Sequence, residues 1–175
     1  MEMAYFGERP SANIQRIFGH LPQEMQLLTQ VSQTLSMCLS TLSPIDQDYG
    51  LCHGDLHTGN VHFVSSHPTL FDFDCLGYGW RAYDLATFWW SRLLFEPDEA
   101  QQGACWRSFL VGYERERPIQ PPTLSLIPAF TLARQLWVMG IHTDTVTAHY
   151  GRSWLNGKYV QKHFGFLQRL LQNFV

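Results

Sequence analysis

The sequence predicts an α+β protein that is mostly α-helical, with a short β-hairpin in its middle. Two patterns support this fold class. Apolar residues recur at steps of three and four across residues 21–42, which is the spacing of an amphipathic helix. Residues 51–73 instead hold short apolar runs broken by glycine, asparagine and proline, as strands joined by tight turns do. Because 175 residues suffice for one core, we predict a single domain over residues 1–175.

Helical patterns cover most of the chain on both sides of the hairpin. Residues 1–20 fit an arm or a short helix. The predicted helices span residues 21–42, 82–95, 98–117, 123–142 and 157–172, with a loop at 143–154. Pro128 predicts a kink or a place in a first helical turn. In the helix at 98–117 we expect a buried stripe made of Trp106, Phe109, Leu110 and Tyr113.

A polar loop follows the first short strand of the central segment. Cys52 ends an apolar run, and residues 53–60 cannot extend it, because Gly54 and Gly59 weaken a strand. After the loop we predict a strand, a turn and a second strand at residues 61–64, 65–68 and 69–73, followed by an irregular loop at 74–81.

Three oxygen-bearing side chains are expected to meet at the base of this hairpin. A hairpin brings its outer ends together, so Asp72 returns to the side on which Asp55 and Asn60 lie. A carboxylate such as Asp55 can orient an alcohol and accept its proton during attack on a nucleotide phosphate. Carboxylate and amide oxygens, as in Asp72 and Asn60, are ligands that Mg²⁺ prefers.

The same residues match a known motif. His53, Asp55, Leu56 and Asn60 have the spacing of the protein-kinase catalytic loop H-R-D-L-x-x-x-N, and a D-F-D sequence at 72–74 stands in the place of D-F-G. Glycine replaces the arginine of the loop, and no A-P-E follows. With these departures, HGDLHTGN, LFDFD and YDLA within residues 53–86 resemble the aminoglycoside phosphotransferase and choline kinase group.

The resemblance implies the C-terminal lobe of a protein-kinase-like fold, with the short hairpin carrying the catalytic loop. It implies ATP-dependent phosphotransfer to a hydroxyl of a small-molecule acceptor, with Mg²⁺. By this likeness Asp55 is the catalytic base, Asn60 and Asp72 hold the metal, and Asp84 braces the loop from the next helix.

Four further residues are candidates for supporting roles. His53 is interpreted as a structural histidine that bonds backbone rather than a proton shuttle. Asp74 either accepts hydrogen bonds beside the metal or touches it. Since the helix at 123–142 lines the acceptor cleft in similar family members, Arg134 and Trp137 are candidate substrate contacts.

The lobe that clamps the nucleotide is missing from the sequence pattern. Only 54 residues precede Asp55, most with helical character, and the first lysine of the chain is Lys158. No glycine-rich phosphate loop occurs among them. We therefore predict a fragment, truncated product or split protein that lacks an N-terminal lobe and has weak or undetectable turnover alone.

Composition excludes several function classes. Twelve basic and 15 acidic residues give a net charge of −3, which predicts no nucleic-acid face. We find no signal peptide and no apolar run near the ~20 residues of a membrane span. Four widely spaced cysteines predict reduced thiols and a cytoplasmic location.

Three other functions stay open at this point. A pseudokinase-like scaffold would keep the fold without turnover. A haloacid-dehalogenase-like phosphatase would use Asp72 as nucleophile and Asp74 as acid. A metallohydrolase would bind zinc or a similar metal through a set rich in imidazole, made of His53, Asp55, His57 and His62.

Overall fold

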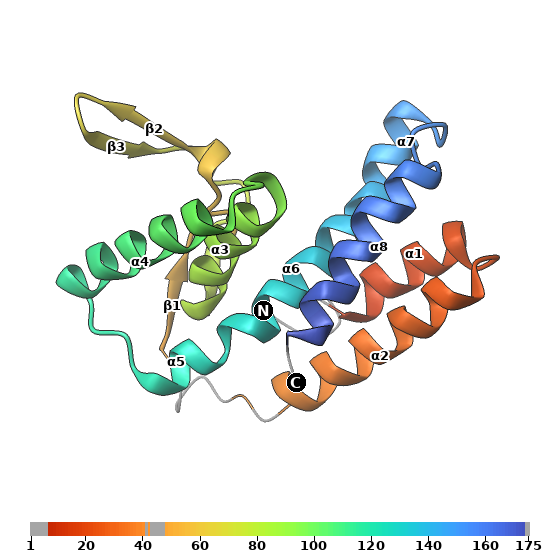
Figure 1. Ribbon diagram of the computed structural model, residues 1–175, viewed down its shortest axis with the longest axis horizontal. Helices are drawn as coiled ribbons and strands as arrows, with labels where there is room; N and C mark the ends of the chain where they lie inside the picture. The colour runs from red at the N-terminus through yellow and green to blue at the C-terminus, as the bar shows by residue number, and fades with distance from the viewer. Residues whose placement is uncertain (1–6, 41, 43–47, 174–175) are drawn as a thin grey trace. The chain divides into compact units, whose positions relative to one another are not determined.

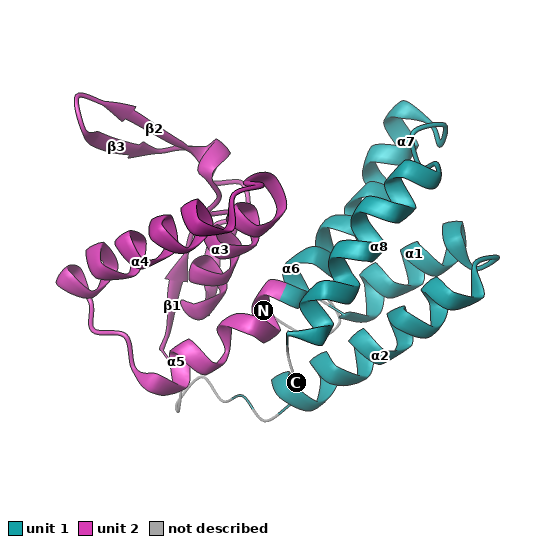
Figure 2. Cartoon of the chain, viewed as in Figure 1, with its two compact units in different colours: residues 1–42, 132–175 teal, residues 43–131 magenta. Residues whose placement is uncertain are grey.

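The computed structural model describes residues 7–40, 42 and 48–173 (Figure 1). The chain divides into two compact units (Figure 2). One comprises residues 1–42 and 132–175, and the other comprises residues 43–131. The candidate catalytic residues all lie in the unit of residues 43–131, which is therefore described first.

Two small antiparallel sheets frame the central segment. Strand β1 (Tyr49–Cys52) pairs with β4 (Gly77–Trp80), and β2 (Val61–Val64) pairs with β3 (His67–Leu70). The hairpin predicted between residues 61 and 73 is therefore confirmed. A short 3₁₀ turn, η2 (Thr58–Asn60), leads directly into β2.

The second hairpin strand, predicted at residues 69–73, is wrong at both ends because it spans His67–Leu70, and the irregular loop predicted at 74–81 is also partly wrong. The second hairpin strand begins at His67, not at residue 69, because Ser65 and Ser66 alone form the turn. Both have positive φ, 48° and 69°, as a two-residue hairpin turn of the primed type requires. Residues 77–80 form a strand and not an irregular loop, since β1 supplies a pairing edge that local sequence does not reveal.

Helices complete this unit, and their bounds are α3 (Ala82–Phe95), α4 (Glu99–Glu116), α5 (Pro121–Ser125) and the start of α6 (Ile127–Ile141). The predictions for α3 and α4 are confirmed. Asp98 caps α4 by accepting hydrogen bonds from the backbone N–H groups of residues 100 and 101. Helix α5 ends before α6 begins, and Pro128 lies in the first turn of α6.

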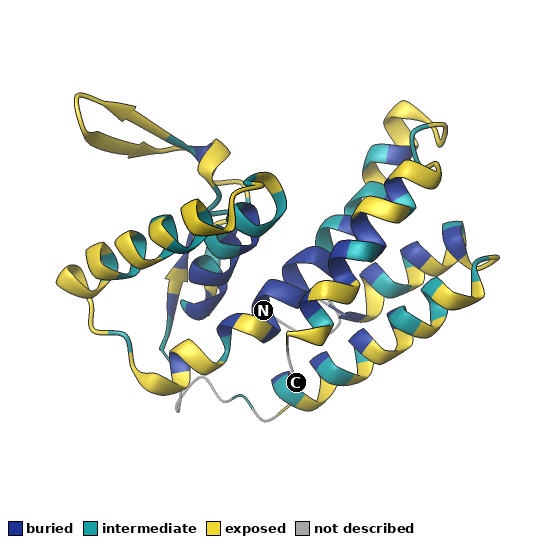
Figure 3. Cartoon of the chain, viewed as in Figure 1, coloured by how far each residue is buried: buried dark blue, intermediate teal, exposed yellow. Residues whose placement is uncertain are grey.

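The buried stripe expected on α4 is only half-buried. No residue of α4 is fully buried, as Figure 3 shows along the length of the helix. Its rings instead stack in a ladder against α3, with Phe88 and Phe109 centred 4.0 Å apart and Trp89 and Trp106 5.1 Å apart. Stacked rings satisfy the helical periodicity without requiring complete burial.

The other unit is a helical bundle. It contains α1 (Arg9–Phe18), α2 (Pro22–Leu39), the later part of α6, the π-helix η3 (His142–Val146), α7 (Thr147–Tyr150) and α8 (Gly157–Gln172). The helices expected at 21–42 and 157–172 are confirmed. The loop expected at 143–154 is partly wrong, because η3 and α7 continue the helical path of α6. The core of this unit includes the fully buried Ile14, Val31, Leu35, Leu136 and Leu167.

One helical stretch is long and apolar enough to cross a membrane. It spans Pro121–Tyr150, with a mean hydropathy of 1.4 in its most apolar window, although no such span was expected from sequence. Within this fold 61% of that window is buried against other parts of the protein. The core helix of a packed domain has this character.

A cluster of titratable rings lies within the helical bundle. The Nδ1 atom of His142 and the hydroxyl of Tyr159 share a hydrogen bond of 3.1 Å, and the Tyr159 and His163 rings lie 4.3 Å apart. Gln135 donates to both the Nδ1 atom and the backbone carbonyl of His163 at 3.3 Å. Burial, then the charges of His142 and Lys162, lower the pKa of His163 to about 4.

This cluster predicts that acid destabilises the protein. Because the folded-state pKa of His163 lies below the ordinary ~6.5, its contribution is complete above that pH and is lost as pH falls toward about 4. The free energy of unfolding should fall by up to ~1.4 kcal/mol per pH unit for this histidine. Urea denaturation across that range measures the slope. His163→Phe should reduce it, and an unchanged slope would contradict the prediction.

Candidate active site

The segment that carries the candidate residues is closed at its base by a sheet. Cys52 at the end of β1 pairs with Gly77 at the start of β4. Residues 53–76 therefore form a long connection whose two ends lie side by side on this sheet. The turn η2 and the hairpin β2–β3 both lie within this connection between β1 and β4. The sheet therefore holds the loop after β1 beside the turn that precedes β4.

One carboxylate fixes the start of the loop. Asp84, in the first turn of α3, accepts hydrogen bonds from the backbone N–H of His53 at 2.7 Å and of Gly54 at 2.8 Å. Both bonds are charge-assisted, so they are stronger than bonds between neutral groups. This is the geometry that bracing of the loop from α3 requires.

Gly54 is required by its surroundings. Its φ of +80° lies in the left-handed region, and a Cβ at this position would collide with the backbone carbonyl of Cys75. The loop therefore packs directly against the turn that follows Asp74. This contact gives a physical reason for the glycine that replaces arginine in the protein-kinase pattern.

Asp55 and Asn60 are in direct contact. The Nδ2 atom of Asn60 donates to the backbone carbonyl of Asp55 at 3.0 Å and to its Oδ2 atom at 3.3 Å. Asn60 is buried, whereas Asp55 is partly exposed. Since Nδ2 makes both contacts, the Oδ1 atom of Asn60 is the one left to face a cation.

His53 connects the loop to the hairpin. Its Nδ1 atom accepts from the backbone N–H of Asp55 at 3.3 Å, so Nε2 carries the proton that is donated to the carbonyl of Phe71 at 3.0 Å. Its ring also contacts that of Phe73, with centroids 4.7 Å apart. His53 thus contacts both sequence neighbours of Asp72. These contacts agree with its interpretation as a structural histidine.

Asp72 lies just past the paired part of the hairpin. The backbone N–H of Phe71 donates to the carbonyl of Asn60 at 3.2 Å, which continues the pairing of β2 and β3 by one residue. Asp72 itself has a φ of 63° and is exposed. Left-handed backbone at a non-glycine residue is uncommon and is concentrated at functional sites.

The carboxylates of Asp72 and Asp74 are available for other partners. Both side chains are exposed, and neither makes a hydrogen bond or ion pair within the described residues. The roles assigned to Asp55, Asn60, Asp72 and Asp74 stay predictions. What the structure adds is that the first two touch and that His53 fixes the backbone around the third.

His57 was assigned no role from the sequence except as a ligand in the metallohydrolase alternative. Its Nδ1 atom accepts from the backbone N–H of Gly59 at 2.9 Å, which leaves Nε2 at 3.7 Å from the Oδ2 atom of Asp55. The spacing of two residues from Asp55 is the only sign of this proximity in the sequence. His62 lies on the hairpin, with its ring 5.7 Å from that of Phe71.

The imidazole-rich metal site is not supported. Among residues 7–40, 42 and 48–173, no three His, Cys, Asp or Glu side chains are grouped so that they could hold a metal ion. All four residues of the metallohydrolase alternative lie within these ranges. This absence does not apply to a metal site made of one amide and one carboxylate, because such a site has no group of three His, Cys, Asp or Glu side chains.

A second carboxylate anchors the strand that leads into the loop. Asp48 accepts from Arg81 at 2.6 Å and from both Nε and NH2 of Arg117. Burial raises the pKa of Asp48, but hydrogen bonds and charge from Arg117 and Arg81 outweigh burial and lower it. Sequence reasoning missed this cluster, because no local spacing relates positions 48, 81 and 117.

Arg134 and Trp137 lie in the other compact unit. The Arg134 guanidinium stacks on the Trp137 ring, 4.5 Å from its centroid, and the arginine is buried. Trp137 also lines a cavity of about 170 Å³ with residues from α1 and η3. Their role as substrate contacts stays a prediction.

Replacement of Gly54 by alanine should destabilise the protein. The left-handed backbone costs a Cβ-bearing residue ~1–2 kcal/mol, and the collision with the Cys75 carbonyl adds to this cost. We expect a loss of at least ~2 kcal/mol in urea denaturation. Gly112→Ala on α4, where a Cβ meets nothing within 4 Å, is the matched control. Equal stability of the two variants would contradict this account.

Removal of the Asp84 carboxylate should loosen the loop. Asp84→Ala leaves two backbone N–H groups without their acceptor, at a cost of ~3 kcal/mol. Hydrogen exchange at the amides of His53 and Gly54 should accelerate. Asp84→Asn keeps one acceptor oxygen and should have a smaller effect. Unchanged exchange in the alanine variant would exclude the bracing role.

The chain is similar to known phosphotransferases over most of its length. The model of the phosphotransferase enzyme family (APH) matches residues 8–119. An uncharacterized protein of Deinococcus radiodurans is 30% identical over 95% of this chain and 48% of its own length. The chain thus spans about half the length of the curated relatives that it matches.

Two solved structures share the fold. The amicoumacin kinase hAmiN in complex with AMP-PNP, Ca²⁺ and Ami has a TM-score of 0.68 at 27% identity, over 85% of this chain and 45% of its own. A microcompartment-associated aminopropanol kinase has a TM-score of 0.60 at 25% identity, over 85% and 43%. These neighbours contradict a haloacid-dehalogenase-like phosphatase. The chain belongs to the phosphotransferase enzyme family and has a kinase-like fold.

Proposed function

We propose that this protein contributes the catalytic loop to ATP-dependent phosphotransfer onto a hydroxyl group of a small molecule. The observation that carries the proposal is the contact of Asp55 with Asn60, in a loop that His53 ties to the backbone around Asp72. A base, an amide and a second carboxylate are the side chains that this reaction needs in one place.

Asp55 is proposed to orient the acceptor hydroxyl and to accept its proton. Its carboxylate is partly exposed, so an acceptor can reach it. Asn60 contacts one carboxylate oxygen, and the Nε2 atom of His57 lies 3.7 Å from the same oxygen. These neighbours hold the carboxylate in one orientation, and positioning of this kind supplies much of the catalysis in phosphoryl transfer.

Asn60 and Asp72 are proposed to hold Mg²⁺. Both offer oxygen, the donor that this ion prefers, and the contacts of the Asn60 Nδ2 atom leave its Oδ1 atom for the metal. The exposed Asp72 carboxylate has no competing partner among the described side chains. A bound cation would neutralise charge on the phosphate oxygens. Divalent metal use is supported by the Ca²⁺ named in the hAmiN complex.

The remaining residues are proposed to position this group. Asp84 holds the loop through two backbone N–H groups, and His53 couples it to the hairpin. Asp74, exposed two residues after Asp72, can accept hydrogen bonds from metal-bound water. Arg134 and Trp137 are proposed as acceptor contacts on the helical bundle.

Nucleotide clamping is assigned to an N-terminal lobe that the described chain does not contain. The relatives are about twice as long as the matched region, which leaves room for such a lobe. Without it we expect weak or undetectable turnover, since the phosphates would lack most of their contacts.

A cytoplasmic location stays a proposal, supported by four cysteines that form no disulfide.

A fusion tests the proposed chemistry. The unmatched half of the Deinococcus radiodurans relative would be joined ahead of this chain, and Mg²⁺-dependent ADP formation measured with a panel of small alcohols. Asp55→Asn should lower the rate by ~10²–10⁴-fold, the usual range for removal of a general base. Asn60→Ala and Asp72→Asn should raise the Mg²⁺ concentration needed for half-maximal rate.

Asp98→Asn is the control for this experiment. It changes an exposed carboxylate in the same unit, and asparagine still caps α4, so the rate should not change. A rate for Asp55→Asn within about twofold of the parent fusion would exclude the catalytic role. A folded fusion that forms no ADP with any acceptor would favour the pseudokinase-like scaffold.

A further inference from the structure

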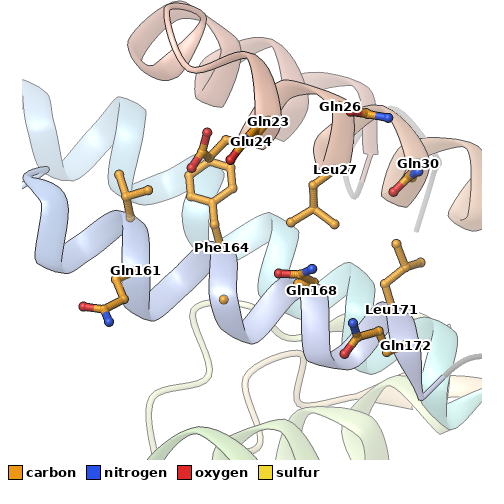
Figure 4. Close-up of a pocket in the computed structure, with 12 residues that line it drawn as sticks. Gln23, Glu24, Gln26, Leu27, Gln30, Gln161, Phe164, Gln168, Leu171 and Gln172 are labelled. Carbon is orange, nitrogen blue, oxygen red and sulfur yellow. The ribbon is translucent and has the colours of Figure 1, made fainter.

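One groove lies in the helical bundle, the unit that does not contain Asp55, Asn60 or Asp72. It has a volume of about 690 Å³ and lies between α2 and α8, and Figure 4 shows the residues that line it. Pockets that take small molecules have volumes of roughly 300–1,000 Å³. All of its lining residues belong to one compact unit, so the groove does not depend on how the two units are placed.

The floor of the groove is apolar. Leu27 of α2 and Phe164 of α8 point into the space between the two helices, and Leu171 lies further along α8 (Figure 4). Phe164 is buried and packs edge-on against Phe18, with ring centroids 5.4 Å apart. Phe164 therefore supports the floor from the core of the bundle, and the partly exposed Leu27 and Leu171 form its apolar surface.

The rim of the groove is made of uncharged amides. Six glutamines line it: Gln23, Gln26, Gln30, Gln161, Gln168 and Gln172. None of these side chains has a hydrogen-bond partner within the described residues. Nearly half of all the glutamines in the sequence gather at this one place.

Charge is almost absent from the lining. Glu24 is the only charged residue, and neither lysine nor arginine contributes. Anionic ligands such as phosphates need positive groups or helix N-termini to replace their hydration. The groove therefore disfavours a nucleotide or a sugar phosphate. It suits a neutral ligand whose groups both donate and accept hydrogen bonds.

Gly165 is one of the residues that line the groove. It lies within α8, where glycine is less favourable than alanine, yet a Cβ at this position would meet no atom within 4 Å. Packing within the protein thus gives no reason for glycine here. The open space lets a ligand approach the helix backbone closely.

We propose that the groove between α2 and α8 binds a neutral, polyhydroxylated ligand of about disaccharide size. Glutamine amides match hydroxyl groups because both can donate and accept hydrogen bonds. The partly exposed Leu27 and Leu171 suit the apolar C–H faces of a sugar ring. The site is separate from the residues of the proposed phosphotransfer and does not rest on that function.

Side-chain amide NMR of the full chain tests the proposal. With ¹⁵N-labelled glutamine, titration with sucrose, maltose and trehalose to tens of millimolar should shift the signals of the six groove glutamines. Gln101, Gln102 and Gln120 lie in the other unit and serve as internal controls. Affinity in the millimolar range is expected for an exposed polar groove.

Gly165→Leu provides the decisive variant. The substitution removes an unfavourable helix residue, and its Cβ meets no atom within 4 Å, so we expect the variant to fold, as thermal denaturation would verify, and its side chain to occupy space in the groove. Affinity should fall at least about tenfold. Gly112→Leu on α4 is the matched control and should bind as the parent does.

Three results would overturn the proposal. The first is the absence of shifts with all three sugars. The second is retained affinity in Gly165→Leu. The third is equal binding of glucose 6-phosphate, which would show that the uncharged lining does not select against anions.

Discussion

The arrangement of the candidate site depends on two hydrogen bonds from the loop after β1 to a single carboxylate. Asp84 stands on α3 and receives the N–H groups of His53 and Gly54. Helix α3 is itself fixed by packing, since Tyr83 and Leu85 on either side of Asp84 are buried. The two hydrogen bonds thus fix a polar loop to a helix that is held in place by buried side chains. A rigid element that orients a polar loop is the usual basis of a precise site.

His53 extends this order from the loop to the hairpin. An isolated two-stranded hairpin is marginally stable, and every residue of β2 and β3 is at least partly exposed. The bond from the His53 ring to the carbonyl of Phe71 and the contact with Phe73 act where such a hairpin would otherwise fray. Hydrogen bonding and ring packing replace burial as the source of order near Asp72.

The sequence was most informative where chemistry is encoded locally. The sequence predicted that Asp55 and Asn60 meet, which their hydrogen bonds confirm, and the helices α3 and α8 follow their periodic patterns closely. It was least informative where a partner lies far along the chain. Strand β4 forms because β1 pairs with it, and the Asp48 cluster joins residues up to 69 positions apart. Nor does periodicity distinguish burial from stacking, as the ladder between α3 and α4 shows.

The fit between Gly54 and the Cys75 carbonyl joins two parts of the site that lie more than twenty positions apart. Any side chain at Gly54 needs a different path for the turn after Asp74. The contact is to a backbone carbonyl, so it constrains the residue type at position 54 and the backbone path at position 75 together. Loop and turn are expected to diverge as one inherited unit, with a change in either tolerated only alongside a compensating change in the other.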